Sequence, residues 1–206
     1  RLELSRTSRP PAVARVALLA AVAVFIVGVG LTAWWPGTGI RIAGAGLLAQ
    51  AMWLGRFDVA RHTVRMHGAT RYMALALIAG FVWLAVAAVA WIAQGALTGG
   101  GFAYDAMLHA IFVGFVFSMI FAHAPVIVPA VLGVALPFRQ SFYLPLVLLH
   151  GSLIVRLLGD AAGNEAAWRW GGVLNELAIV LYLTLAASSA ARHKRARASS
   201  AARRTA

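Results

Sequence analysis

The sequence predicts an all-α integral membrane protein, a bundle of about six transmembrane helices with both termini in the cytoplasm. The 206 residues are 62% hydrophobic and only 12% charged, with a mean hydropathy of +0.82, whereas an ordinary soluble domain has about 25% charged residues. The apolar residues also gather into runs of about 20, the length that a helix needs to cross the hydrocarbon core. A chain of this length has room for about six such runs and almost none for a soluble domain.

Two apolar runs open the chain. Residues 12–35 are too long for the apolar core of a signal peptide, so a retained helix is expected there. Residues 40–55 form a shorter run that contains Gln50, and Gly44 and Gly46 give it a small surface for close helix packing. Both runs are therefore predicted to be transmembrane helices.

Four further spans are expected after residues 56–71, a basic segment that suits a cytoplasmic helix at the membrane interface. The predicted ranges are 72–94, 104–123, 142–160 and 168–189. Pro125 and Pro129 are expected to kink or break the chain after the fourth span. Residues 130–136 are then either a re-entrant piece or a continued helix. The predicted organisation is a basic N-terminus at 1–11, a membrane domain at 12–189 and a basic tail at 190–206.

The charges predict the orientation. Most of the 18 lysines and arginines lie in the N-terminus, in alternate loops and in the tail, so the positive-inside rule places both termini in the cytoplasm. The tryptophans at the opposite helix ends suit the outer interface: Trp34, Trp35, Trp91, Trp168 and Trp170. The tail lacks aromatic residues that could stack on bases, so we interpret it as a topology determinant that touches anionic lipid, and nucleic-acid binding is not expected.

A few polar residues lie within the predicted spans, where each costs several kcal/mol unless it is paired or bound. These candidate site residues are His109, His123, His150, Arg156, Asn175 and Glu176. The chain has no cysteine, so a metal would need histidine, carboxylate or methionine ligands. Imidazole is neutral at membrane depth and binds iron or copper well, which makes the three histidines candidate metal or haem ligands.

The spacing of these residues leaves several arrangements open. His109 and His123 are separated by about 21 Å of rise and lie about 40° from the same face of a regular helix. His150 either ligates a cofactor or hydrogen-bonds a backbone carbonyl. Arg156 can pair with Asp160 one turn later, reach Glu176 or donate to haem propionates. Glu176 pairs with the arginine, carries a proton or belongs to a proton path, and Asn175 is expected to cross-link helices.

Short motifs in the second half of the chain resemble the repeat of the NnrS family. They are His109-Ala110, Gly114-Phe115, Leu148-Leu149, Arg156-Leu157-Leu158, and Trp170 with Tyr182. That family consists of polytopic bacterial membrane proteins that contain haem and copper and are associated with nitric-oxide metabolism. The resemblance implies haem or copper ligation at His109 and His150. This chain departs from the family in being about half the usual length and in its His123-Ala124-Pro125 break.

Two functions are expected for a protein of this kind in the bacterial inner membrane. The first is histidine-ligated binding of haem b, with copper as a second choice, for electron transfer or the handling of nitric oxide or another small oxidant. The alternative is a cofactor-free accessory subunit that packs around a larger respiratory or photosynthetic membrane complex or forms a homo-oligomer. A transporter is disfavoured because the sequence lacks repeat symmetry and paired broken helices. Whether the chain is an enzyme stays open.

Overall fold

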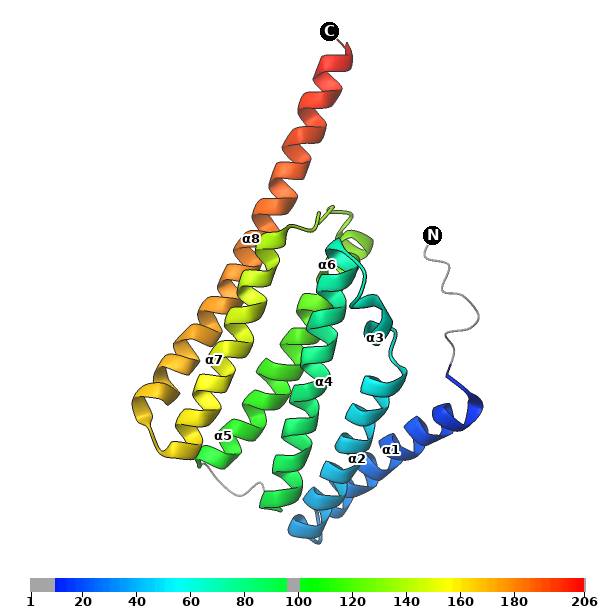
Figure 1. Ribbon diagram of the computed structural model, residues 1–206, viewed down its shortest axis with the longest axis vertical. Helices are drawn as coiled ribbons and strands as arrows, with labels where there is room; N and C mark the ends of the chain where they lie inside the picture. Colours follow the sequence, from blue (N-terminus) through cyan, green and yellow to red (C-terminus); the bar gives the residue numbers. More distant parts are fainter. Residues whose placement is uncertain (1–9, 96–100, 206) are drawn as a thin grey trace.

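The computed structural model describes residues 10–95 and 101–205, and over these ranges the secondary structure is entirely helical (Figure 1). The elements in chain order are α1 (Ala12–Leu31), α2 (Pro36–Phe57), α3 (Ala60–Thr63), α4 (Gly68–Gln94), α5 (Phe102–His109), a π-helix (Ala110–Val116), α6 (Phe117–Leu132), a 3₁₀ turn (Gln140–Phe142), α7 (Tyr143–Ala162) and α8 (Glu165–Thr205). The all-helical class predicted from the sequence is confirmed.

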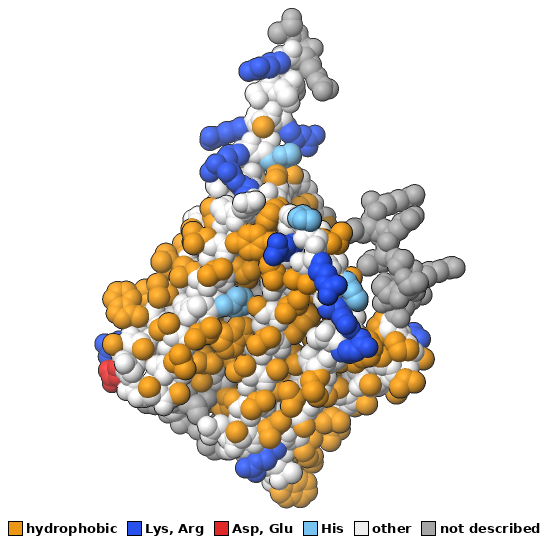
Figure 2. Space-filling model, in the orientation of Figure 1, with side chains coloured by type: hydrophobic (Ala, Val, Ile, Leu, Met, Phe, Trp, Pro, Cys, Tyr) orange, Lys and Arg blue, Asp and Glu red, His pale blue; other side chains and the backbone are white. Residues whose placement is uncertain are grey.

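Five helical segments are long and apolar enough to cross a membrane. They are Ala12–Leu31, Gly68–Gln94, Tyr104–Leu132, Gln140–Ala162 and Glu165–Ser200. Helix α2 has 22 residues but is not among them, because polar and small residues interrupt its apolar run. Hydrophobic side chains cover most of the visible face of the bundle (Figure 2). Many large ones are strongly exposed, for example Val13 at 80% and Val131 at 73%. These features are consistent with a multi-pass membrane protein.

The helices pack as two hairpins on either side of a central pair. The α1–α2 hairpin lies against α4, and α7 pairs with α8 on the other side (Figure 1). The continuous rod made of α5, the π-helix and α6 packs between α4 and α7. We call the end that holds the α1–α2 and α7–α8 turns the Trp35 end, and the opposite end the Arg139 end. Helix α8 extends beyond the bundle at the Arg139 end (Figure 1).

The hairpin of α1 and α2 is built on glycines. A Cβ atom at Gly28 would overlap the backbone of Ala43, and one at Gly46 would lie 2.5 Å from the backbone nitrogen of Phe25. The two backbones therefore touch, as the small-residue surface predicted for this part of the chain implies. Gly44 instead faces α4, where a Cβ would lie 3.0 Å from the carbonyl oxygen of Ala88.

The prolines of the fourth span do not break it: of the two outcomes expected for Pro125 and Pro129, a kink or a break, the break is excluded, and the helix continues to Leu132. Helix α6 runs through Pro125 and Pro129 and ends at Gly133, whose φ of +64° suits glycine. Proline has no N–H, so Pro125 leaves the Phe121 carbonyl without its usual helical donor. The Tyr182 hydroxyl of α8 donates to that carbonyl at 3.3 Å. A neighbouring helix thus supplies the missing hydrogen bond.

The C-terminal basic segment is also helical. Helix α8 continues without interruption past Ser189, the expected end of the last span, and reaches Thr205. The sequence predicted only a polar tail for this segment. Since arginine, lysine and alanine favour helix, an existing helix end propagates easily into such a sequence.

Candidate functional site

A charged cluster joins three helices at the Trp35 end of the bundle. The Arg156 guanidinium of α7 donates two hydrogen bonds to the Asp105 carboxylate of α5, from Nη2 at 2.9 Å and from Nε at 3.0 Å. The indole N–H of Trp168, on α8, donates to the same carboxylate at 3.2 Å. The guanidinium carbon also lies 4.7 Å from the centroid of the Trp168 ring, which adds a cation–π contact. Asp105 is therefore the centre of the cluster.

Glycines of α8 make room for the arginine. A Cβ atom at Gly171 would lie 2.7 Å from the Cα of Arg156, and one at Gly172 would lie 2.6 Å from its Nη1. This close approach leaves Arg156 only 7% exposed. Its Nη1 donates to the Trp168 carbonyl at 3.3 Å. The donors of Arg156 are thus used within the protein, and few remain for a cofactor carboxylate.

The pairing of Arg156 differs from the arrangements expected from the sequence. Asp160, one helical turn away, is 5% exposed, and neither of its carboxylate oxygens has a hydrogen-bond partner among the described residues. The arginine binds Asp105 instead, which is 51 residues away in the chain. Spacing within one helix could not reveal this partner, because it depends on how α5 packs against α7. The only signal in the sequence was an acidic residue next to the start of an apolar run.

His109 lies one turn from Asp105 and is held by it. Its Nδ1 is 2.9 Å from the Asp105 carbonyl oxygen and 3.3 Å from a carboxylate oxygen of the same residue. In the neutral imidazole these acceptors favour the tautomer with the proton on Nδ1, in which Nε2 carries the lone pair. His109 is therefore oriented as metal-binding histidines are, with one nitrogen fixed by an oxygen acceptor and the other available.

His123 has the same local geometry in a different environment. Its Nδ1 lies 2.8 Å from the Met119 carbonyl oxygen, which favours the same neutral tautomer, and its Nε2 has no hydrogen-bond partner among the described residues. The side chain is exposed and lines an apolar groove of about 420 Å³ on the outside of α6, with Ile120 and Ile127 among its neighbours. At both histidines a backbone carbonyl oxygen fixes Nδ1. His109 lies beside the charged cluster, whereas His123 lines an apolar groove.

A π-helix lies between His109 and His123. The prediction that the two histidines lie near one face assumed a regular α-helix. Residues Ala110–Val116 form i→i+5 hydrogen bonds, so each residue turns the chain by less than it would in an α-helix. The rotation between His109 and His123 is consequently different from that of a regular helix. Gly114 lies in this segment, and a Cβ atom there would lie 2.5 Å from the Trp83 ring. Because Gly114 has no side chain, the Trp83 ring can pack directly against the backbone of the π-helix.

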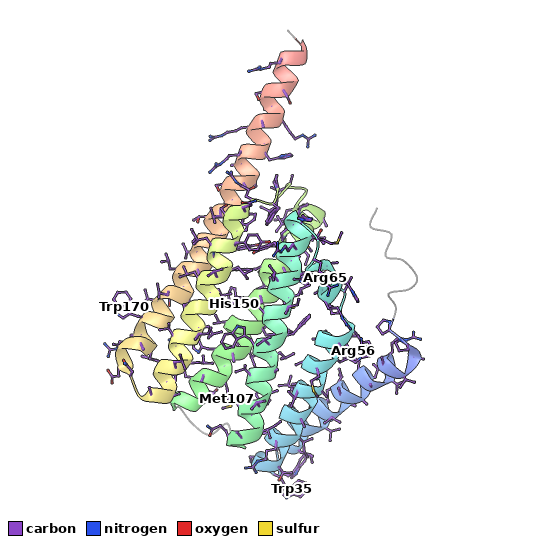
Figure 3. The ribbon with its side chains drawn as sticks, in the orientation of Figure 1. Trp35, Arg56, Arg65, Met107, His150 and Trp170 are labelled. Carbon is purple, nitrogen blue, oxygen red and sulfur yellow. The ribbon has the colours of Figure 1, made fainter. Side chains whose placement is uncertain are left out.

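His150 accepts a hydrogen bond from Trp83 about midway along the bundle, between α7 and α4 (Figure 3). The indole N–H donates to Nδ1 at 3.0 Å, and the two rings are nearly parallel, at 18°. Since Nδ1 is the acceptor, the proton of the neutral imidazole is on Nε2. That nitrogen is buried and has no partner among the described residues. In this arrangement Nε2 has no lone pair for a metal, so His150 does not fit the role of ligand.

Asn175 and Glu176 point in different directions from α8. Asn175 is 4% exposed, and its side-chain oxygen accepts a hydrogen bond from Ser152 of α7 at 2.5 Å, which confirms the predicted cross-link between helices. Glu176 is exposed on the outside of the bundle and has no hydrogen-bond or ion-pair partner among the described residues. Of the three roles expected for Glu176, pairing with Arg156 is therefore wrong, because the arginine binds Asp105. Successive helical residues are about 100° apart, so the residue after a buried asparagine turns outward.

Some of the predicted ligand residues lie in positions that suit a metal or haem, and others do not. Within residues 10–95 and 101–205, no three or more histidine and carboxylate side chains come together as a metal site. His109 and His123 each have Nδ1 fixed by a backbone carbonyl oxygen, whereas His150 and Arg156 are engaged by Trp83 and Asp105. Asp105, Trp83 and Trp168 were missed by reasoning from the sequence.

The fold and the site together define a helical protein with several apolar helices, consistent with insertion in a membrane through multiple passes. The chain belongs to the family described as Domain of unknown function (DUF8744), whose profile matches residues 1–191. No curated protein and no solved structure matches the chain. These comparisons do not bear on the resemblance to the NnrS family, which stays a prediction.

Proposed function

We propose that the chain is a six-span protein of the bacterial inner membrane, with both termini in the cytoplasm, that binds another membrane protein through the outward face of α8. The sixth span is α2, whose 22 residues pack between α1 and α4. Its polar residues are tolerated because neighbouring helices cover much of its surface. The basic residues at the Arg139 end, including those on α8, support the cytoplasmic placement of that end (Figure 2).

The observation that carries this proposal is the position of Glu176. It lies eleven residues after the start of α8, or about 16 Å along the helix axis. Exposed apolar side chains surround it on the same face, among them Val173, Leu177 and Val180, each more than half exposed. A carboxylate that faces lipid at this depth costs several kcal/mol. A partner helix that offers a lysine, an arginine or a hydrogen-bond donor at the same depth removes that cost.

The apolar stripe beside Glu176 has the form of a helix-docking face. Val173, Val180 and Leu183 recur at helical spacing and are 52–60% exposed. A second copy of the chain is a poorer occupant, because two-fold symmetry about the membrane normal would bring two Glu176 carboxylates to the same depth. We therefore assign the face to a different membrane protein, and a larger respiratory or photosynthetic complex is the class of partner that the sequence predicts.

Site-specific photocross-linking in intact cells tests this assignment. A photoreactive residue at Val180 should give one discrete adduct with a membrane protein, and the Glu176→Leu substitution should reduce its yield about tenfold or more if pairing is worth more than about 1.4 kcal/mol. The matched control is the photoreactive residue at Val147, which is 68% exposed on α7. The same adduct from Val147, an adduct that survives Glu176→Leu, or an adduct formed by two copies of this chain would contradict the proposal.

Haem binding is the second candidate, and the orientation of His109 and His123 favours it. Each imidazole has Nδ1 fixed by a carbonyl oxygen, at 2.9 and 2.8 Å, and presents Nε2. Haem would supply one-electron chemistry when bound. Arg156 and His150 fit this candidate less well, since their polar atoms are engaged within the protein.

An absorption spectrum of the purified protein, oxidised and reduced, with metal analysis of the same sample, tests this candidate. A b-type spectrum that is lost in His109→Ala or His123→Ala and retained in His150→Ala is the expected result. Protein without haem, or a spectrum that needs only His150, would contradict it.

A further inference from the structure

A groove with one apolar and one basic wall lies at the Arg139 end, where α8 leaves the bundle. Its volume is about 420 Å³. Residues 133–135 form one wall, and Ala190, His193, Lys194 and Arg197 form the other. The four residues of α8 follow the i, i+3, i+4, i+7 pattern, so they lie on one face of the helix. At this groove the apolar end of the bundle therefore lies next to a row of basic side chains on α8.

The groove is held open by the local backbone. Helix α6 ends at Gly133, where a φ of +64° turns the chain toward α8. The Ser189 hydroxyl of α8 then donates to the Pro137 carbonyl at 2.8 Å and fixes the segment against the helix. Leu136, which precedes Pro137 in the chain, is 7% exposed and packs in the main hydrophobic core cluster. Both walls are therefore positioned by contacts within the chain.

The charge of the groove is not balanced by the protein. Its lining contains no carboxylate, and no acidic residue follows Glu176 in the sequence. Lys194 and Arg197 are exposed and form no ion pair among the described residues. The groove lies where the apolar part of α8 gives way to basic residues, which is the level of lipid headgroups for a helix that spans a bilayer. Val134 and Ala135 face this same space.

We propose that this groove binds one anionic phospholipid, with the headgroup phosphate at Lys194 and Arg197 and the upper part of an acyl chain along Val134 and Ala135. Charge complementarity selects an anion, and the apolar wall selects a lipid over free phosphate. The proposal rests on the chain lying in a bilayer. It does not depend on the partner assigned to the outward face of α8.

Native mass spectrometry of the full chain in neutral detergent tests the proposal. Titration with phosphatidylglycerol should give one tightly bound lipid, and phosphatidylcholine should bind about tenfold or more weakly. The double variant Lys194→Ala/Arg197→Ala should bind phosphatidylglycerol roughly 30-fold more weakly, since each cation near a headgroup is worth about 1 kcal/mol. The matched control is Arg192→Ala/Arg195→Ala, which removes the same charge from the opposite face of α8 and should change the affinity by less than about twofold.

A third variant separates the groove from the charge. Ala190→Phe fills the space between the walls without changing any charge and should also abolish the tight site. Three results would overturn the proposal: equal losses in the two double variants, wild-type binding in Ala190→Phe, or inorganic phosphate competing as well as phosphatidylglycerol. The first would indicate diffuse attraction to the tail, the second a headgroup outside the groove, and the third a simple anion site.

Discussion

Arg156 and Asp105 form a two-point ion pair that joins α7 to α5, with hydrogen bonds of 2.9 and 3.0 Å. Arg156 is 7% exposed, and the pair is closed on one side by the Trp168 ring. Removing Asp105 would leave the nearly buried Arg156 charge without its partner, whereas removing Arg156 would leave Asp105, whose side chain is 27% exposed, partly solvated. The pair is therefore expected to act as a single unit in the stability of the bundle.

The first prediction concerns this unit. Arg156→Ala should destabilise the protein by about 1–3 kcal/mol, because the Asp105 carboxylate, whose side chain is 27% exposed, loses both charged hydrogen bonds. Asp105→Asn/Arg156→Met should be more stable than Arg156→Ala, because position 105 then carries no unpaired charge. Thermal unfolding in detergent measures both variants. The control is Arg169→Ala, which removes an exposed pair with Glu165 at 3.4 Å and should change stability by less than about 1 kcal/mol. A double variant that is no more stable than Arg156→Ala would contradict the prediction.

The second prediction compares two tryptophans of α4. Trp83 donates its indole N–H to His150, whereas the indole nitrogen of Trp91 is buried with no partner among the described residues. Trp83→Phe should cost about 1–3 kcal/mol more than Trp91→Phe, because it leaves the His150 Nδ1 unpaired in the interior. Thermal unfolding of the two variants, side by side, gives the difference. Equal loss of stability in the two variants would show that the Trp83–His150 hydrogen bond does not contribute to stability.

The third prediction separates two glycines of α1. A Cβ atom at Gly28 would overlap the Ala43 backbone, while one at Gly30 meets nothing within 4 Å. Gly28→Leu should push α1 from α2 and cost about 1–3 kcal/mol or more. Gly30→Leu should leave stability unchanged within about 0.5 kcal/mol. Because the chain has no cysteine, cross-linking of cysteines introduced across the α1–α2 interface can report the separation directly. Equal cross-linking in the two variants would show that the close contact is absent.

Apolar run length and composition were enough to predict the helical class and the ranges of most helices. These ranges could be predicted because the length of an apolar run and the need to satisfy its backbone hydrogen bonds within the helix determine where a helix forms. The identity of individual side chains matters less. The sequence left open whether the prolines kink or break the fourth span. A proline removes one hydrogen bond locally, but whether the helix breaks depends on what a neighbouring helix supplies, and the Tyr182 hydroxyl reaches Phe121 from 61 residues away.

The candidate site was less predictable, because several of its contacts also come from neighbouring helices. His109, His123 and Asn175 make contacts within one turn or across the adjacent hairpin, and their polar character was enough to select them. The partners of Arg156 and His150 are Asp105 and Trp83, which come from helices that packing brings close. Glu176 faces outward because of one step of helical rotation. Depth along a helix follows from the sequence, whereas the direction of a side chain follows only from the packed bundle.

The last prediction tests how α6 survives its prolines. Tyr182→Phe should cost about 1–3 kcal/mol, because the Phe121 carbonyl is then left without a donor inside the bundle. Pro125→Ala restores the N–H that Phe121 lacks, so in that background Tyr182→Phe should cost much less. The phenyl ring still stacks on Phe121, whose centroid lies 3.9 Å from that of Tyr182, so the substitution isolates the hydroxyl. A double-mutant cycle from thermal unfolding measures the coupling. If Tyr182→Phe costs the same with and without Pro125, the hydroxyl does not replace the missing N–H.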